Sequence, residues 1–134
     1  MPNLMITKQK ITEEDDLVIA RHLVRKISLE MGFGLVDQTR IITAVSELTR
    51  NALIYGGGGV MILEIIKKTS MGLKITIKDS GPGIEDIKQA LVDGYSTGAG
   101  LGNGLGGSRR LMDEFEMSSQ PGEGTRIVTI KWLP

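Results

Sequence analysis

The sequence predicts one α/β (α+β) domain, a two-layer α/β sandwich with helices on one face of a mixed, mostly antiparallel sheet. The first supporting observation is periodicity: apolar residues recur at helical spacing in two N-terminal segments and alternate with polar residues in several others. The second is the order of segments, which runs strand, helix, helix, strand, strand, helix, loop, helix, strand, strand. This order lacks the regular βαβ alternation of a doubly wound sheet.

The chain is expected to begin with a strand and a long helix. Residues 4–11 alternate apolar and polar side chains, which is typical of a strand with one face in water. Thr12 and the acids after it predict the start of a helix, because a capping hydroxyl and negative charge both suit the positive end of the helix dipole. Apolar residues continue at helical spacing to Met31, and Gly32 ends the helix.

A second helix and a β-hairpin follow. Asp37 is predicted to cap the start of this helix. An apolar stripe then continues to Ala52, and the glycines at 56–59 end the helix. Residues 60–67 and 73–79 are rich in strand-forming side chains and are separated by a short turn, which predicts an antiparallel pair.

The C-terminal part is predicted from shorter signals. A short helix is expected over 84–92, and residues 93–107 hold seven glycines in a loop long enough to be functional. A helix is expected over 108–115, and two strands over 116–119 and 125–133, joined by a turn.

Composition excludes several function classes. The 134 residues carry 16 Lys+Arg and 16 Asp+Glu, and only one Trp, two Tyr and two Phe, which argues against nucleic-acid binding. The absence of cysteine excludes disulfides, thiolate metal sites and a cysteine nucleophile. No segment has the pattern of a signal peptide or a membrane span. We therefore expect a single cytoplasmic domain over residues 1–134, without membrane partners.

Glycine is the unusual residue, with 18 in 134, about twice its average usage. Three motif matches can be set aside. Gly102-x-Gly104-x-x-Gly107 does not follow a convincing strand, as a dinucleotide site requires, and no Gly-Lys pair exists for a P-loop. Gly94 to Gly98 has the spacing of a nucleophile elbow, but the single histidine lies upstream of its serine.

Three elements remain and together predict a nucleotide site. Glu47 and Asn51 are four residues apart on the second helix and so share a face. Asp79 ends a strand and is followed by Gly81 and Gly83, which allow another molecule to approach the backbone. The glycine run 98–107 leads into a helix, whose free N–H groups and dipole suit phosphate.

These residues resemble the motifs of the GHKL superfamily, the Bergerat-fold ATP-binding domains of histidine kinases, Hsp90, gyrase and MutL. Glu47 to Asn51 resembles the N box, Asp79 to Gly83 the G1 box, Gly98 to Gly106 the G2 box, and Gly124-Thr125 the last conserved element. Within the superfamily, the chain is most similar to the small bacterial anti-sigma kinases and to the serine/threonine kinases of the stressosome. The segments that carry this closer resemblance are 31–34, 36–38, 47–51, 111–115 and 130–133.

The resemblance implies a role for each matching residue. It implies that Glu47 is the general base, that Asn51 ligates Mg²⁺ on the ATP phosphates, and that Asp79 accepts from the adenine amino group. Thr125 would support the adenine, and the glycine-rich segment at about 93–107 would form a lid over the phosphates. The implied ATP-contacting residues are Asn51, Asp79, Gly81, Gly83, Gly98, Gly100, Leu101, Gly102, Gly104, Leu105, Gly106 and Thr125.

The resemblance also implies partners and leaves alternatives open. The implied substrate is a serine on a STAS-domain protein of the RsbS or RsbR kind, and the implied later partner is an RsbU-like PP2C phosphatase. Histidine kinases often carry a basic residue where this chain has Ile54, which disfavours a sensor kinase. An anti-sigma factor that sequesters a sigma subunit, and an ATP-gated binding module without phosphotransfer, remain as alternatives. Arg50 could contact a phosphate or form an ion pair.

Overall fold

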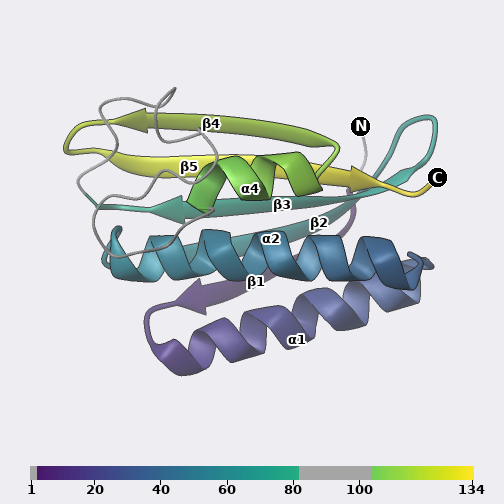
Figure 1. Ribbon diagram of the computed structural model, residues 1–134, viewed down its shortest axis with the longest axis horizontal. Coiled ribbons are helices and arrows are strands. Elements are labelled where there is room, and N and C mark those ends of the chain that lie inside the picture. Colours follow the sequence, from purple (N-terminus) through teal and green to yellow (C-terminus); the bar gives the residue numbers. More distant parts are fainter. Residues whose placement is uncertain (1–2, 82–103) are drawn as a thin grey trace.

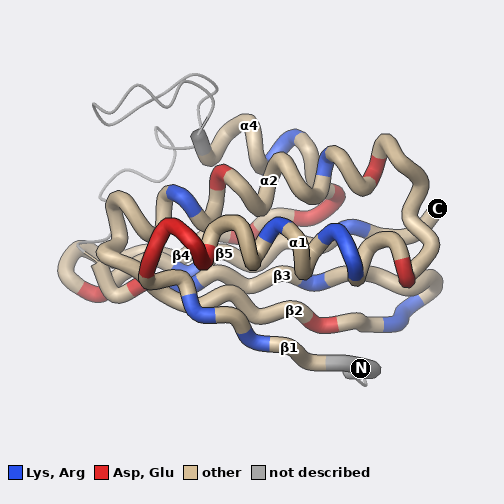
Figure 2. The backbone as a smooth tube through the Cα atoms, turned by 90° about the horizontal axis from the view of Figure 1, so that it is seen from below, with Lys and Arg blue, Asp and Glu red and all other residues tan. Residues whose placement is uncertain are grey.

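The computed structural model describes residues 3–81 and 104–134, and it has the predicted two layers (Figure 1). A five-stranded sheet forms one layer, with strand order β1-β2-β3-β5-β4. The described helices cover one of its faces (Figure 2). The elements in chain order are β1 Asn3–Ile11, α1 Glu14–Met31, α2 Leu35–Ile54, β2 Gly59–Lys67, β3 Met71–Asp79, α4 Gly104–Leu111, β4 Glu114–Gln120 and β5 Gly124–Trp132.

The expectation of a mixed sheet is wrong for the described strands. Each of the neighbouring pairs β1–β2, β2–β3, β3–β5 and β4–β5 is antiparallel. The reason is the connectivity: β2–β3 and β4–β5 are hairpins, and the α1–α2 pair returns the chain so that β2 runs against β1. The expected helix over 84–92 lies outside the described residues. No helix in the described ranges is long and apolar enough to cross a bilayer.

The hydrophobic core lies between the helices and the sheet. Apolar stripes of α1 and α2 face alternate residues of the central strands, as the two periodicities require. Fully buried members of this core include Val24, Ile41, Val45, Leu48, Met61, Leu63, Leu73 and Ile75. Burial of this kind stabilises a domain by about 25 cal/mol per Å² of apolar surface, and it fixes the rotation of α2 about its axis.

The start of α1 differs from the prediction, because the N-cap residue is Glu13 and not Thr12. At the start of the helix, the side chain of Asp16 in the first turn is the hydrogen-bond acceptor. Its Oδ2 accepts from the backbone N–H of Thr12 at 2.9 Å and of Glu13 at 3.0 Å, and from the Thr12 hydroxyl at 3.1 Å. A buried carboxylate therefore accepts from the backbone N–H groups of Thr12 and Glu13 and from the Thr12 hydroxyl that was expected to cap the helix.

This cap predicts a pH dependence of stability. The N–H of Thr12 above all lowers the pKa of Asp16 from its ordinary 3.8, against the opposing effect of burial. A lowered folded-state pKa means that the stabilisation by Asp16 is complete at neutral pH. It declines as the pH falls below 3.8 and is lost below the lowered value. The free energy of unfolding of Asp16→Asn should thus fall below wild type at pH 7 and converge with it in acid.

The matched control for this prediction is Asp15→Asn, which removes the same charge from the same turn without removing a hydrogen bond of the cap. A gap between Asp16→Asn and wild type that persists unchanged into strong acid would contradict the role of the ionised carboxylate.

Helix α2 also begins earlier than predicted. Its N-cap is Gly34, and Asp37 lies inside the first turn, so the predicted cap at Asp37 is wrong. Asp37 instead forms ion pairs with Arg40 at 3.2 Å and with the buried Lys131 at 3.8 Å. Lys131 also donates to the backbone oxygen of Leu111 at 2.9 Å. The carboxylate of Asp37, which the sequence pattern predicted to be a helix cap, thus forms a tertiary contact with β5 instead.

Helix α4 spans Gly104–Leu111, whereas the prediction was 108–115. Glycines are poor helix formers, so the local sequence argues against a start at 104. Packing outweighs this preference, because Leu105 and Ser108 in the helix are buried and Leu105 belongs to the hydrophobic core, as does Met112 just after the helix. Since Gly104 to Gly107 are helical, the predicted loop at 93–107 is wrong for its last four residues, and its other residues lie outside the described ranges.

Candidate functional site

The predicted site residues on α2 lie on one face near its C-terminal end. Glu47 and Asn51 are separated by one helical turn, and both side chains are half-buried. Between them, Leu48 and Thr49 are buried in the core, and the Thr49 hydroxyl donates to the backbone oxygen of Val45 at 2.7 Å. The burial of these two neighbours sets the direction in which Glu47 and Asn51 point.

Glu47 has a basic neighbour on the same helix. Arg50 Nη1 lies 3.6 Å from Glu47 Oε1, and the two side chains are 38% and 27% exposed. Of the two roles considered for Arg50, the structure shows the intramolecular ion pair, and a contact with a phosphate stays a prediction. An exposed pair of this kind adds little stability, but it restricts where the carboxylate of Glu47 can lie.

Two polar atoms at this end of α2 are buried without a hydrogen-bond partner in the described part of the chain. They are Oδ1 of Asn51 and the hydroxyl of Tyr55, which caps α2 one turn further on. Leaving such an atom unsatisfied costs about 1–3 kcal/mol, so a site of this type favours a ligand that supplies the missing contact. The sequence reasoning missed Tyr55, although its spacing of four residues from Asn51 was a usable signal.

The amide oxygen of Asn51 fits a magnesium ion. Mg²⁺ takes oxygen ligands and is commonly held by one or two protein groups together with phosphates and water. A buried oxygen without a donor meets that need, whereas an amide already engaged with the backbone would not.

Asp79 joins the ends of two strands. It is the last residue of β3, and its Oδ1 accepts from the backbone N–H of Gly81 at 3.0 Å and of Thr125 at 3.2 Å. Its Oδ2 has no hydrogen bond with a described residue. One oxygen of the half-buried carboxylate therefore holds the turn and β5 in place.

Glycines allow three segments to meet around Asp79. A Cβ on Gly56 would collide with the side chain of Asp79, and one on Gly81 would lie 2.5 Å from the Cα of Gly56. Gly124 has φ +90°, and a Cβ there would collide with the backbone oxygen of Asp79. The predicted residues Asp79, Gly81 and Gly124 thus lie together in the structure. Gly56 takes part in the same close contact, although no motif identified it.

We expect Gly124→Ala to destabilise the protein by more than the roughly 1–3 kcal/mol that a left-handed backbone alone costs a non-glycine residue. The physical reason is the added collision with Asp79. Gly122→Ala is the matched control, because Gly122 has φ +82° and an added Cβ meets no atom within 4 Å. Urea unfolding of both variants measures the difference, and equal losses would contradict the packing argument.

Thr125 contributes through its backbone and through its hydroxyl. Its N–H binds Asp79, and its hydroxyl lies 2.9 Å from that of Ser119, which also donates to the backbone oxygen of Gly124 at 3.0 Å. Ser119 lies directly opposite Thr125 on β4. Sequence reasoning missed Ser119, because cross-strand register is not visible along the chain.

Part of the predicted phosphate-binding segment lies at the start of α4. Gly104 begins this helix, and Leu105 and Gly106 are buried in its first turn. The side chain of Leu105 belongs to the hydrophobic core, so any contact that it makes with a nucleotide must come from its backbone. The remaining predicted residues, Gly83, Gly98, Gly100, Leu101 and Gly102, lie outside the described residues.

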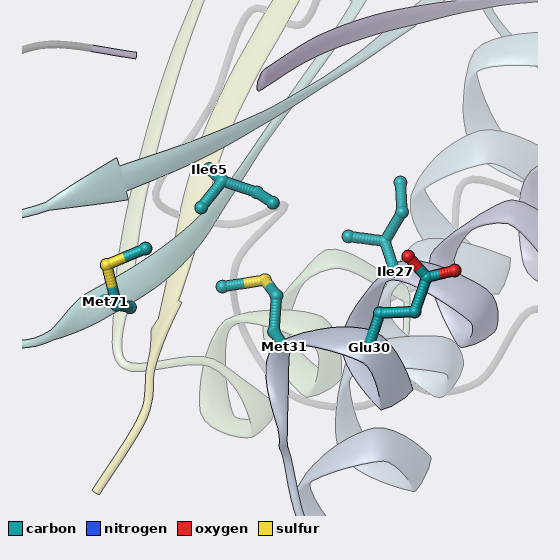
Figure 3. Close-up of a pocket in the computed structure, with 5 residues that line it drawn as sticks. All are labelled: Ile27, Glu30, Met31, Ile65 and Met71. Atoms are coloured by element: carbon teal, nitrogen blue, oxygen red, sulfur yellow. The ribbon is translucent and has the colours of Figure 1, made fainter. Parts of the chain in front are cut away.

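The parts of the site converge at one end of the molecule. The C-terminus of α2, the end of β3, and the starts of β5 and α4 all lie at the left in Figure 1. A cavity of about 380 Å³ lies toward the opposite end, between the C-terminal part of α1 and the strands (Figure 3). Its lining is mainly apolar, with Ile27, Glu30, Met31, Ile65 and Met71, and it includes none of the predicted site residues.

Comparisons with known proteins agree with this fold. Residues 36–134 match the family described as histidine kinase-, DNA gyrase B-, and HSP90-like ATPase. The chain is 52% identical over 125 residues to the serine/threonine-protein kinase RsbT of Bacillus subtilis, covering 92% of this chain and 94% of that protein. It is 34% identical over 121 residues to the anti-sigma F factor of Thermoanaerobacter sp. (strain X514), covering 85% of this chain and 83% of that protein.

Solved structures share the fold. The RsbU and RsbW domains of Rv1364c from Mycobacterium tuberculosis align with a TM-score of 0.66 at 17% identity, over 99% of this chain and 33% of that one. A histidine kinase domain from Erythrobacter litoralis aligns with a TM-score of 0.57 at 20% identity, over 92% of this chain and 61% of that one. The chain thus spans less than two thirds of either solved chain, and at these identities the likeness concerns the fold.

Proposed function

The chain belongs to the histidine kinase-, DNA gyrase B-, and HSP90-like ATPase family, and we propose that it works as an ATP-dependent serine/threonine kinase in a partner-switching system. The 52% identity to a serine/threonine-protein kinase over nearly the whole length supports the kinase activity. The observation that carries the proposal is the buried oxygen of Asn51, which has no hydrogen-bond partner among the described residues and lies one turn from the carboxylate of Glu47. It lies at the same end of the molecule as Asp79 and Thr125.

Asp79 and Thr125 hold the adenine in this proposal. Oδ2 of Asp79, which has no hydrogen bond with a described residue, accepts from the exocyclic amino group of adenine, a donor that guanine lacks at that position. Thr125 lies beside it, oriented by its bonds to Asp79 and Ser119. Gly81 and Gly83 leave room for the ring. Recognition by one oriented oxygen makes the site selective for ATP over GTP.

Asn51 and the start of α4 hold the phosphates. Asn51 would ligate Mg²⁺ through Oδ1, and the bound ion would neutralise charge on the transferring phosphoryl group. The hydroxyl of Tyr55, also unpartnered in the described chain, donates toward the same phosphates. The backbone of Gly104, Leu105 and Gly106 presents helix N-terminal N–H groups to them. Gly98, Gly100, Leu101 and Gly102 extend this contact.

Glu47 acts as the general base. It accepts the proton of the incoming serine hydroxyl, the serine oxygen bonds to the γ-phosphorus, and the bond to the β-phosphate oxygen breaks to release ADP. The ion pair with Arg50 orients the carboxylate of Glu47 before the substrate arrives. Phosphoryl transfer requires little covalent chemistry from the protein, so few catalytic side chains suffice.

The proposed substrate is a serine of a STAS-domain antagonist of the RsbS or RsbR kind, assembled in a stressosome. Once released, the kinase binds and activates an RsbU-like PP2C phosphatase. Kinship with the RsbT kinase of Bacillus subtilis supports these partners.

The direct test incubates the purified protein with radiolabelled ATP, Mg²⁺ and a purified STAS-domain protein. Label on a serine of the STAS protein is expected, together with its loss when that serine is replaced by alanine. Binding of ATP without any transfer would overturn the kinase proposal in favour of an ATP-gated binding module.

A second candidate function is that of an anti-sigma factor kinase that sequesters a sigma subunit. It is favoured by the 34% identity to an anti-sigma F factor over 85% of this chain. Retention of a purified sigma factor on the immobilised protein would support it, and retention of the PP2C phosphatase alone would contradict it.

A further inference from the structure

The sheet has one face that no described helix covers (Figure 2). Strand alternation and the antiparallel register determine which side chains share this face. Near the end that holds Asp79, three basic residues meet three aliphatic ones. We call this group the open-face surface, and its members are Lys8, Val60, Ile62, Lys78, Arg126 and Val128.

Two of the cations are direct cross-strand neighbours. Lys78 on β3 is paired with Arg126 on β5, and both are exposed. Like charges directly opposite each other in an antiparallel pair destabilise a sheet. Neither side chain forms an ion pair with an acid in the described part of the chain. The fold therefore carries an unfavourable pair with nothing described to offset it.

Lys8 extends the positive charge to β1. It is exposed, lies opposite Ile62, and has no ion pair with a described acid. Its neighbour on the same face, Lys10, is already engaged, at 3.8 Å from Glu13 and 3.6 Å from Asp16. Lys8 is thus available to an incoming anion where Lys10 is committed to the start of α1.

Aliphatic side chains lie between the basic ones. Val60 is opposite Lys78 on β3, Ile62 is opposite Lys8 on β1, and Val128 follows Arg126 by two residues. All three are half-buried. A surface of cations around half-buried aliphatic groups matches an amphipathic segment that carries acids beside apolar residues.

The described acids of this face form no ion pair with Lys8, Lys78 or Arg126. Glu64 lies 4.0 Å from Lys74, and Glu114 accepts from the indole N–H of Trp132 at 2.6 Å. Glu116 lies on the edge strand β4, opposite Val128 and diagonal to Arg126. Glu64 and Glu114 thus lie in one cross-strand row farther from Asp79, and Glu116 lies on the edge strand β4. The three basic residues of the open-face surface lie on β1, β3 and β5.

We propose that the open-face surface binds an acidic, amphipathic segment of a protein partner. A protein segment is favoured over nucleic acid, because the net charge of the chain is zero and none of the six residues is aromatic and able to stack on a base. Lys78 and Arg126 each adjoin a residue of the nucleotide site, Asp79 and Thr125, but alternation directs them to the opposite face. The inference does not depend on the proposed kinase activity.

The test uses Lys78→Glu and two fluorescein-labelled peptides. One is a short amphipathic helix of Glu, Ala and Leu, and the other has Gln in place of each Glu. Wild type is expected to bind the acidic peptide, measured by fluorescence anisotropy at low salt, and the variant about three- to tenfold more weakly. The same variant should unfold at higher temperature than wild type, because it replaces a repulsive cross-strand pair by an attractive one.

The control variant is Lys26→Glu, which makes the same charge change on the exposed face of α1. Equal weakening by both variants, or equal affinity for the two peptides, would overturn the proposal. Stronger binding of single-stranded DNA or anionic vesicles than of the acidic peptide would overturn the choice of a protein partner. Binding of a fluorescent ATP analogue is followed in parallel, so a failure of the nucleotide site is distinguished from a failure of this surface.

Discussion

Replacement of Glu47 by alanine is expected to slow phosphoryl transfer by about 10²–10⁴-fold, the usual contribution of a positioned general base. ATP affinity should change little, because the proposed adenine and phosphate contacts come from Asp79, Asn51 and the start of α4. Single-turnover transfer of labelled phosphate to a STAS-domain serine measures the rate, and calorimetric titration measures the affinity.

The matched control is Arg50→Gln, which removes the ion-pair partner at 3.6 Å but leaves the carboxylate of Glu47 in place. A modest loss of transfer rate in Arg50→Gln beside a large loss in Glu47→Ala would show that the carboxylate is the base and that Arg50 only orients it. Unchanged turnover in Glu47→Ala would remove Glu47 from the mechanism. An equal fall in ATP affinity and in rate would instead assign it to binding.

The second large effect is expected for Asp79→Asn, which should weaken ATP binding by roughly 10- to 150-fold, the value of about 1.5–3 kcal/mol for a hydrogen bond to a charged group. The asparagine can keep an oxygen toward the N–H groups of Gly81 and Thr125. Its amide nitrogen then replaces the free Oδ2 and faces another donor on adenine.

Calorimetry with ATP and GTP tests this assignment, and thermal unfolding without nucleotide serves as the control for the fold. Selectivity for ATP over GTP should fall together with the affinity for ATP. Normal ATP binding by Asp79→Asn would contradict the adenine contact. Loss of binding together with a large loss of stability would indicate that Asp79 acts only as the link between β3 and β5.

Much of the fold could be predicted because it depends on local patterns. The helical stripes of α1 and α2 and the alternation of β2, β3 and β5 are visible in one dimension, and the two layers follow from them. The errors lie at the boundaries. Asp37 and Thr12 have the side chains of helix caps, but Asp37 forms an ion pair with Lys131 on β5. The backbone N–H of Thr12 donates to Asp16. Helix α4 begins among glycines because packing of Leu105 outweighs propensity.

The candidate site shows the same division. Residue type and spacing were enough to identify Glu47 and Asn51 as a pair on one helix face and Asp79 as an acid at a strand end, because both features are local. They could not reveal Tyr55, Ser119 or Gly56. Each of these matters only through a burial, a cross-strand partner or a close approach that arises when distant segments meet.

The class of fold, the order of the described elements and the residues proposed for an ATP site can be read from the sequence, because periodicity and motif spacing are properties of the chain. How those residues are used depends on the tertiary structure. It placed one oxygen of Asp79 against the backbone of β5, buried the Asn51 oxygen without a partner among residues 3–81 and 104–134, and set Lys78 opposite Arg126. These facts depend on register and packing between segments, which bring together groups that are far apart along the chain.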